Sequence, residues 1–169
     1  MASDNLDDAP ASSAANVAQA GTPAASDFDE RALQETLRAV ALRRSELVAH
    51  FYGRLFGRHP EFEPLFDGIN FFDLQAKLWA VLQTAARSLR TPQEAGADLH
   101  ELGLFHAERQ IRPEYFDAFQ EALIESLAFM CGPAWSTEAE RAWNTAIALA
   151  ARGVIEGIKS AGDHSGAGG

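Results

Sequence analysis

The sequence predicts an all-α protein, and three observations support this. Apolar residues recur at intervals of three and four from about residue 28 to residue 158. No stretch of the chain shows the strict alternation of a half-buried strand. With 169 residues, 47% hydrophobic and 22% charged, the chain has the size and composition of one globular domain with tails. We therefore expect long helices that share one core.

Composition changes at both ends of the chain. Residues 1–26 consist mainly of Ala, Ser, Asp and Asn with two prolines, and such a segment buries too little apolar surface to order itself. Residues 161–169 are similarly small and polar and are rich in glycine. The sequence therefore predicts a disordered acidic tail over 1–26, a folded domain over 27–160 and a flexible tail over 161–169.

Five apolar stripes at helical spacing define the long helices of the predicted domain. A shorter helix, over about residues 93–108, separates the third stripe from the fourth. In chain order the stripes are Leu33, Leu37 and Val40; Val48, Phe51, Tyr52, Leu55 and Phe56; Phe71, Leu74, Leu78, Val81, Ala85 and Leu89; Phe116, Phe119, Leu123, Leu127 and Met130; and Trp143, Ile147, Ala150, Val154 and Ile158.

Proline and threonine residues indicate where several helices begin. Pro60 is placed to open a short helix that ends at Phe66, because proline is favoured in the first turn of a helix. Thr91 and Thr137 each stand three residues before a glutamate, as in a capping box. We therefore expect helices to start after both threonines.

The charge balance and the single cysteine exclude several classes of protein. The chain has 24 acidic and 14 basic residues and a formal net charge of -10, so it offers no basic surface for nucleic acid or anionic lipid. Cys131 is the only cysteine, which excludes an internal disulfide and a cysteine-ligated metal cluster. The N-terminus lacks the basic start and apolar run of a signal peptide, and no stretch reaches transmembrane length. We expect a cytoplasmic protein that binds neither nucleic acid nor membrane.

His106 is the most informative residue, because it lies in an apolar run with Leu102, Phe105 and Ile111. An imidazole in such surroundings is suited to bind a haem iron through one neutral ring nitrogen, while the other nitrogen donates to a carbonyl near Leu102. A hydrogen-bonded core histidine shows the same local pattern and is commoner. Other parts of the chain must therefore distinguish the two interpretations.

Tyr52 and Phe66 are the next candidates for a functional site. Tyr52 lies in the stripe of Val48 and Leu55, where a purely structural core would contain Phe or Leu. A buried phenol needs a hydrogen-bond partner, which is either a backbone carbonyl or a bound ligand. Phe66 taken alone would be an ordinary core residue.

Two runs of the sequence resemble the globin family, and most closely the bacterial globins related to the haem domain of flavohaemoglobins. The runs are FYGRLFGRHPEFEPLF, which begins at Phe51, and LGLFHAERQIRPEY, which begins at Leu102, and Trp143 is a third match. The resemblance extends from about Phe28 to Lys159. It implies a globin fold, with helices packed around a pocket for haem b.

The resemblance also implies roles for the candidate residues. His106 corresponds to the proximal ligand of the haem iron, Phe66 to the aromatic residue that packs on the porphyrin, and Tyr52 to the distal tyrosine. A phenol O–H there can donate to bound O₂, which has partial negative charge. The remaining haem contacts are expected to be Leu74, Lys77, Leu78, Leu102, Phe105, Ile111, Phe116 and Phe119.

The distal gate position falls on Leu74, where the bacterial family commonly has Gln or His. A shift of one residue would place Gln75 there and put Trp79 in place of Leu78, and we retain Leu74. Tyr52 is then the only obvious distal donor. A lysine three residues on, Lys77, could reach a haem propionate or, as a neutral amine, ligate iron.

The proximal side departs from the flavohaemoglobin pattern. Those proteins place a tyrosine and a glutamate behind the proximal histidine, and the matching positions here are Phe116 and Ile158. This departure argues against peroxidase-like chemistry, because no carboxylate makes the imidazole more anionic. The chain ends before a flavin or nicotinamide domain could begin, so turnover would need an external reductase.

The leading expectation is a protein that reversibly binds O₂, with CO and NO as further ligands, at five-coordinate haem iron. It would serve oxygen transport or gas sensing, as a monomer or homodimer, and would not by itself be an enzyme. One alternative is a nitric oxide dioxygenase that works with a separate reductase. A second is an interaction module that keeps the globin fold without haem, which has no need of His106, Phe66 or Tyr52.

Overall fold

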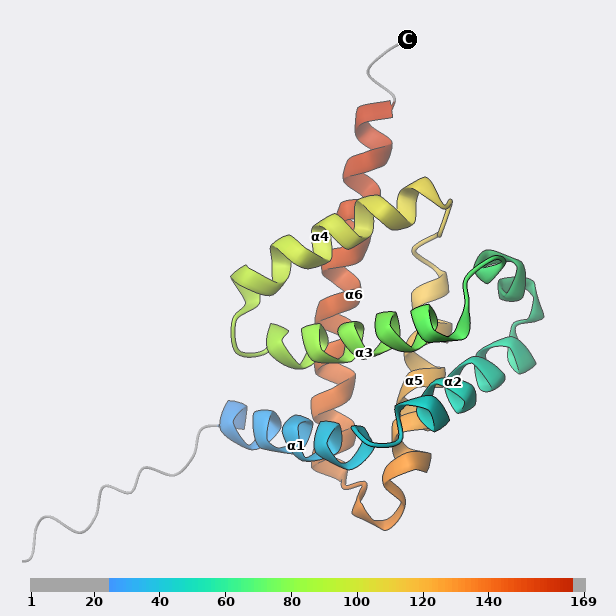
Figure 1. The fold of residues 1–169 in the computed structure, drawn as a ribbon. Helices are drawn as coiled ribbons and strands as arrows, with labels where there is room; N and C mark the ends of the chain where they lie inside the picture. The colour runs from blue at the N-terminus through green and yellow to red at the C-terminus, as the bar shows by residue number, and fades with distance from the viewer. Residues whose placement is uncertain (1–24, 166–169) are drawn as a thin grey trace, which may run out of the picture.

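The computed structural model describes residues 25–165, and within them the chain forms six α-helices and two 3-10 helices with no strand. This confirms the all-α class. The longest helix, α6 (Thr137–Ser165), has 29 residues and at 1.5 Å per residue is about 43 Å long. It runs along the length of the molecule, and most of the other helices pack against it (Figure 1).

The first two helices bury the predicted stripes. α1 (Ala25–Val40) and α2 (Arg44–Arg58) are separated by a short turn. Leu33 and Val40 of α1 and Phe51 of α2 are completely buried. Both helices therefore contribute directly to the core.

A short helix and a glycine turn connect α2 to the next long helix. The segment expected to be helical after the second stripe is a 3-10 helix, η1 (Pro60–Phe66). The chain then turns through Gly68, whose φ of 78° lies in the left-handed region that favours glycine. α3 (Phe71–Ser88) follows, and the Asn70 side chain caps it by accepting a hydrogen bond from the backbone N–H of Asp73 at 3.0 Å.

Both predicted capping boxes differ from what the structure shows. α4 (Pro92–Glu108) does begin after Thr91, but the Thr91 side chain makes no capping hydrogen bond. Its hydroxyl instead donates to the carbonyl oxygen of Arg87 at 3.5 Å, because the end of α3 leaves that carbonyl within reach. At the start of α6 the cap is Ser136 rather than Thr137, since the Ser136 hydroxyl accepts a backbone hydrogen bond three residues on at 3.1 Å.

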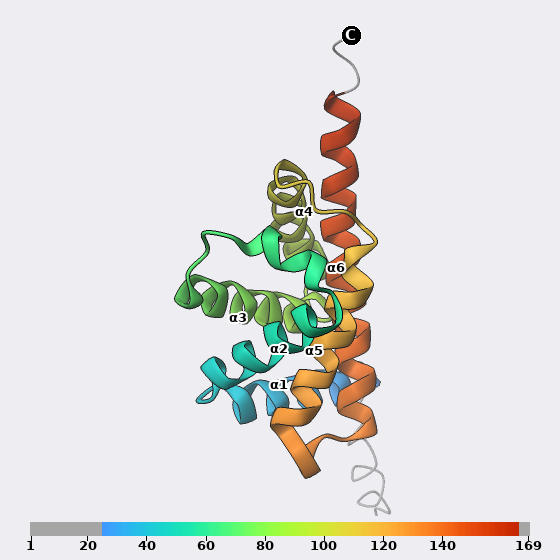
Figure 2. The same cartoon turned by 90° about the vertical axis from the view of Figure 1, so that its right-hand side faces the viewer.

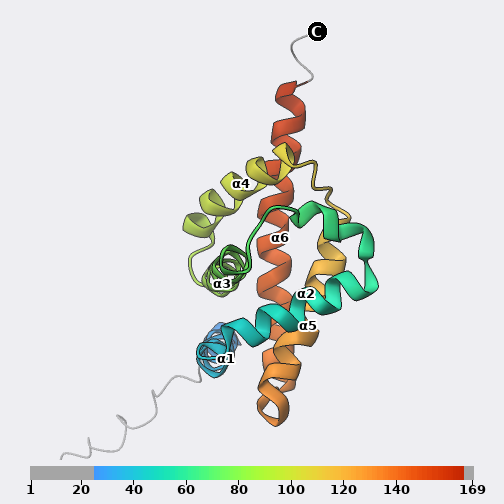
Figure 3. The same cartoon turned by 45° about the vertical axis from the view of Figure 1, so that its right-hand side comes forward.

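The last two long helices form an antiparallel pair. α5 (Tyr115–Cys131) is joined to α6 by the 3-10 helix η2 (Gly132–Ala134), and the two long helices lie side by side (Figure 2). α5 also packs against α2. α3 and α4 lie one above the other on the same side of α6, as Figures 1 and 3 show.

Two glycines bring the backbones of α4 and α6 into contact. A Cβ atom on Gly103 of α4 would lie 2.2 Å from the carbonyl oxygen of Val154 and 2.7 Å from the Cα of Gly157. A Cβ atom on Gly157 would lie 2.3 Å from the carbonyl oxygen of His100. Only glycine permits this approach. Because Gly103 precedes His106 by one turn, the crossing fixes how far His106 stands from α6.

The first and last helices extend to the ends of the described region. α1 begins at Ala25, and α6 continues to Ser165, so residues 161–165 are helical where the sequence predicted the beginning of a flexible tail. The tails predicted over residues 1–24 and 166–169 lie outside the described residues. None of the described helices combines the length and the apolar character needed to cross a membrane.

Candidate functional site

His106 lies in the last turn of α4 with its side chain half-buried. Its Nδ1 lies 2.7 Å from the carbonyl oxygen of Leu102, one turn back, as expected from the sequence. The carbonyl can only accept, so Nδ1 donates the hydrogen and Nε2 keeps its lone pair. Within residues 25–165, Nε2 has no hydrogen-bond partner. The ring is therefore oriented in the way that metal-ligating histidines commonly are.

The surroundings of His106 favour its neutral form. Burial lowers the pKa of the imidazole below its ordinary value, and the positive charges of Arg109 and Lys77 lower this pKa further. The hydrogen bond to Leu102 acts in the opposite direction and raises the pKa, but less than burial lowers it. A neutral imidazole is the form that can bind a metal ion.

Ring contacts along α5 connect the surroundings of His106 with those of Tyr52. The ring centroid of Phe116 lies 6.0 Å from that of His106. One turn further along α5, the ring of Phe119 lies 4.8 Å from that of Phe51, which in turn lies 4.8 Å from the ring of Tyr52. The structure therefore brings these two predicted site residues to the same stretch of α5.

Tyr52 has a phenol group that is largely enclosed by aromatic rings. Its ring centroid lies 5.2 Å from that of Phe66 and 5.5 Å from that of Phe56. Burial raises the pKa of Tyr52 to about 12, so the hydroxyl keeps its proton near neutral pH. In the part of the chain that the structure describes, no group forms a hydrogen bond with this hydroxyl. Tyr52 therefore offers an unused donor in apolar surroundings.

Leu74 and Gln75 of α3 face different sides of the helix. Leu78 is 2% exposed and Leu74 is half-buried against the core. The Gln75 side chain instead accepts a hydrogen bond from the Ser45 hydroxyl of α2 at 3.0 Å. Leu74 therefore lies against the core, and Gln75 lies on the side of α3 that meets α2.

Two cations share one exposed ring beside His106. The Arg109 guanidinium lies 3.6 Å from the centroid of the Phe105 ring, and the Lys77 ammonium of α3 lies 5.7 Å from it. Phe105 is 38% exposed. Neither cation forms an ion pair with any residue between 25 and 165. The two helices therefore place unpaired positive charge next to the half-buried imidazole.

The chain turns sharply after α4 and leads Ile111 back towards the helix end. Gln110 adopts a φ of 57°, which is uncommon for a residue other than glycine. The backbone N–H groups of Arg109 and Ile111 both donate to the His106 carbonyl oxygen at 3.1 Å. Ile111 is half-buried. This turn holds the backbone of His106, and the sequence analysis missed it because no glycine marks the turn.

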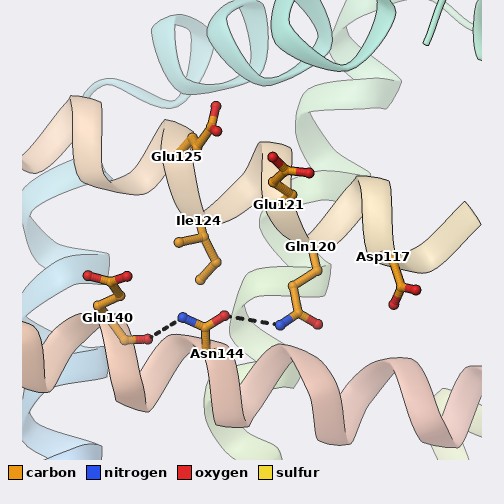
Figure 4. A pocket seen from close by; sticks show the side chains of 7 residues that line it. All are labelled: Asp117, Gln120, Glu121, Ile124, Glu125, Glu140 and Asn144. Carbon is orange, nitrogen blue, oxygen red and sulfur yellow. Dashed lines mark hydrogen bonds between the residues drawn. The ribbon is translucent and has the colours of Figure 1, made fainter. Parts of the chain in front are cut away.

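The structure has one solvent-accessible cavity away from His106 and a larger one next to the end of α4. One, of about 330 Å³, lies between α5 and α6, where the Gln120 amide donates to Asn144 at 3.1 Å among four carboxylate side chains (Figure 4). The other, of about 940 Å³, lies between the end of α4, the loop that follows and the C-terminal part of α6. It is bordered by Ile111 and Ile158.

The residues described above fit a haem better than a bare metal ion. The described residues contain no group of three or more His, Cys, Asp or Glu side chains that could hold an ion. A single imidazole suffices only if a porphyrin supplies the other iron ligands. Apolar side chains around His106 and Tyr52 suit the macrocycle, and the unpaired Lys77 and Arg109 suit its two carboxylates.

Comparison with known proteins identifies the family. The family model described as Globin matches residues 49–154, which is more than half of the chain. The chain therefore belongs to the globin family, and haem is its cofactor. It is 26% identical over 113 residues to the flavohemoprotein of Rhizobium meliloti, a match that covers 66% of this chain and 28% of that protein.

Solved structures show the same fold at lower sequence identity. A bacterial globin from Campylobacter jejuni has a TM-score of 0.71 and 16% identity, with 81% of this chain and 99% of that chain covered. A flavohemoglobin from Malassezia yamatoensis with bound FAD and haem has a TM-score of 0.65 and 22% identity, with 79% and 36% covered. A hexacoordinated haem protein from an anhydrobiotic tardigrade has a TM-score of 0.68 and 16% identity, with 78% and 93% covered. The chain thus spans about a third of the flavohemoglobin structure it matches and less of the flavohemoprotein.

Proposed function

We propose that this globin reversibly binds O₂ at the iron of haem b, with His106 as the protein ligand of the iron and Tyr52 as the donor to the gas. The observation that supports this most is the state of His106. Its ring is half-buried and held by the hydrogen bond to Leu102, and its Nε2 has no partner in the described chain. When bound, haem would supply an iron that can take O₂, CO or NO, with His106 as its protein ligand.

Tyr52 would control how long the gas stays. Its hydroxyl remains protonated because burial raises the pKa to about 12, and it has no competing partner among the described residues. In apolar surroundings a hydrogen bond from such a phenol is worth roughly 1 to 3 kcal/mol. This corresponds to about a tenfold to hundredfold decrease in the rate of ligand dissociation. The neighbouring rings of Phe66 and Phe119 would exclude water.

Lys77 and Arg109 would hold the haem propionates. Both cations are unpaired within residues 25–165 and lie over the partly exposed ring of Phe105. Carboxylates at this position would gain charge-assisted hydrogen bonds near the protein surface. The contact between Lys77 and Phe105 supports this role over ligation of iron by the Lys77 amine.

The proximal side supports binding of O₂ rather than cleavage of its O–O bond. The partner of His106 Nδ1 is a backbone carbonyl, which makes the imidazole less anionic than a carboxylate would. Phe116, whose ring lies 6.0 Å from His106, and Ile158 are apolar at the positions that the resemblance assigns to tyrosine and glutamate. The side chains near His106 therefore favour a gas carrier or sensor.

Nitric oxide dioxygenation is the second candidate, because the chain is 26% identical over 113 residues to the flavohemoprotein of Rhizobium meliloti. It would require electrons from a flavin reductase. Stopped-flow mixing of the oxygenated chain with nitric oxide, followed by a reductase and NADH, separates the two functions. Sustained nitrate formation over many turnovers supports the dioxygenase, whereas one equivalent of nitrate per chain contradicts it.

Haem titration of the full chain tests the proposed function. We expect one haem per chain, and a sharp Soret band in the ferrous carbon monoxide complex. His106→Ala should lose tight binding, whereas His100→Ala should retain it because His100 is exposed on the same helix. If the parent chain is folded and helical but does not retain haem, the proposal fails. The protein would then be a haem-free interaction module.

A further inference from the structure

We propose that the first turn of α2 clamps α3 in one rotation, so that Gln75 is held outside the gas site and Tyr52 is the only side-chain donor there. This inference rests on the proposed function and concerns two positioning residues, Arg44 and Ser45. It concerns two contacts between α2 and α3, Ser45 with Gln75 and Arg44 with Trp79, which are not part of the proposed haem site.

The first contact of the clamp holds the Gln75 amide. The Ser45 hydroxyl donates to Gln75 Oε1 at 3.0 Å, across 30 residues of sequence. Gln75 is half-buried, whereas Ser45 is exposed, so the amide is directed towards α2 and its outer edge. The hydrogen bond therefore holds the Gln75 amide, which a rotation of α3 could otherwise bring inwards, on the side of the helix that meets α2.

The second contact lies one turn further along α3. The Arg44 guanidinium lies 4.0 Å from the centroid of the Trp79 ring, which is half-buried. The Arg44 Nε is buried and has no hydrogen-bond partner in the described chain. Leaving a buried donor unpaired is unfavourable, so contact with the ring must compensate for it. Arg44 therefore contributes at this position through its stacking on α3.

These two contacts lie on the side of α3 next to its buried face. Gln75 and Trp79 are four residues apart and share one side of the helix, where they meet α2. Leu74 and Leu78 share the adjacent side, and Leu78 is 2% exposed. A rotation of α3 by about 100°, the angle of one residue, would bring Gln75 and Trp79 to the side that Leu74 and Leu78 now occupy. The clamp opposes this rotation at two points.

The same helix presents both the clamp and the distal donor. Ser45 and Tyr52 are seven residues apart on α2, which places them on the same side two turns apart. A change in the first turn of α2 can therefore alter the polarity around Tyr52 without touching Tyr52. The predicted result is a second donor, the Gln75 amide, competing for the bound gas.

The test compares an unclamped chain with matched variants of the same helix turn. Arg44→Met/Ser45→Ala removes both contacts, and Gln75→Leu removes the amide. Arg43→Met/Glu46→Gln is the control, because that neighbouring ion pair forms no hydrogen bond or ion pair with α3; Arg43 donates instead to the Met130 carbonyl oxygen of α5. The measurements are the C–O stretching band of the carbon monoxide complex and the dissociation rate of O₂ in the full chain.

We expect Gln75→Leu alone and the control to keep the parent band and to change the O₂ dissociation rate less than twofold. The unclamped chain should show a second, lower-frequency C–O band and at least a threefold change in rate. Adding Gln75→Leu to the unclamped chain should abolish the new band. The inference is overturned if Gln75→Leu alone accelerates dissociation more than fivefold, or if the unclamped chain retains the parent band and rate.

A measurement without haem separates this inference from the proposed function. The ¹⁵N side-chain amide signal of Gln75 in the full chain without added haem should shift in Ser45→Ala and return in Ser45→Thr. A shift of this kind would support the clamp even if haem titration failed. An unchanged signal in Ser45→Ala would overturn the clamp even if haem bound tightly.

Discussion

At the scale of single residues, the two proposed ligand-binding groups share one property. The Nε2 atom of His106 and the hydroxyl of Tyr52 both lie in apolar surroundings without a partner in the described chain. Each group can therefore take an external ligand without first breaking a hydrogen bond to the described chain. The proposed function assigns the iron to the first group and the gas to the second.

Tyr52→Phe should accelerate O₂ dissociation about tenfold to hundredfold, because it removes the hydrogen bond to the gas. The unfolding free energy of the chain should stay the same or rise by up to about 1 kcal/mol, since the hydroxyl has no protein partner to lose. Flash photolysis and urea unfolding measure the two quantities. Tyr115→Phe is the control, because the Tyr115 hydroxyl accepts a hydrogen bond from Arg112 near the surface. Equal dissociation rates in Tyr52→Phe and the parent would contradict the role.

Acid should weaken the folded chain through His106. Because burial lowers the pKa of His106 in the folded state, the unfolded chain binds this proton more readily. The free energy of unfolding therefore has its full value above the ordinary histidine pKa of about 6.5. It decreases as the pH falls from there through the lowered pKa of His106 in the folded state. Urea unfolding of haem-free protein between about pH 7 and pH 5 should show a smaller decrease for His106→Gln than for the parent. Identical pH dependence in the two chains would contradict this.

At the scale of secondary structure elements, the crossing of α4 and α6 determines where His106 stands. A Cβ atom on Gly103 would meet the backbone of α6 at 2.2 Å, so the two helices cannot keep their distance if Gly103 is replaced. Backbone atoms cannot move aside as a flexible side chain can. The position of His106, one turn later, therefore depends on a residue that makes no contact with the proposed ligand.

Gly103→Ala should lower the unfolding free energy by roughly 1 to 3 kcal/mol, the usual cost of overpacking, and should increase the rate of haem loss. Gly96→Ala on the same helix is the matched control, because a Cβ atom there meets nothing within 4 Å. Alanine is the better helix former, so Gly96→Ala should gain up to about 1 kcal/mol. Urea unfolding and haem transfer to apomyoglobin measure both effects. The crossing has no such role if the two variants behave alike.

The helices themselves could be predicted from the sequence because their apolar periodicity is local. The stripe from Phe71 to Leu89 predicts α3 (Phe71–Ser88) almost to the residue. Contacts between segments that are distant in the sequence leave no local pattern of this kind, so they could not be predicted. The hydrogen bond from Ser45 to Gln75 joins two polar residues whose types are also common on solvent-exposed helix faces. From the sequence alone, Gly103 is a residue of low helix propensity, and its close contact with α6 is not visible. The hydrogen bond of His106 to Leu102 was predictable because it spans one helical turn.

At the scale of the whole molecule, the charges are arranged unevenly. Most arginines form ion pairs with nearby carboxylates, as Arg54 and Arg58 of α2 do with Glu125 of α5. Lys77 and Arg109 are two of the cations without an ion pair within residues 25–165, as are Arg38, Arg44, Arg152 and Lys159, but these two lie beside the half-buried imidazole. In a chain with a formal net charge of -10, this local positive charge is the place where a dianionic cofactor is favoured.

Haem should therefore stabilise the molecule as a whole. At a free haem concentration 100 times the dissociation constant, binding to the folded chain adds about 2.7 kcal/mol. Differential scanning calorimetry should show a higher midpoint of unfolding with haem than without. Lys77→Gln/Arg109→Gln should reduce this increase, while Arg152→Gln, an exposed site on α6, should leave it intact. A midpoint that haem does not change would show that the folded state has no preferred site for it.

The most direct test of the central claim is restoration of the iron–imidazole bond in a chain that lacks the His106 side chain. Resonance Raman spectra of the ferrous parent chain should show an iron–histidine stretching band. We predict that His106→Gly loses this band and that added imidazole restores a band of the same kind, whereas His100→Gly retains the parent spectrum. A band that persists unchanged in His106→Gly without imidazole would show that another residue binds the iron and would contradict the account.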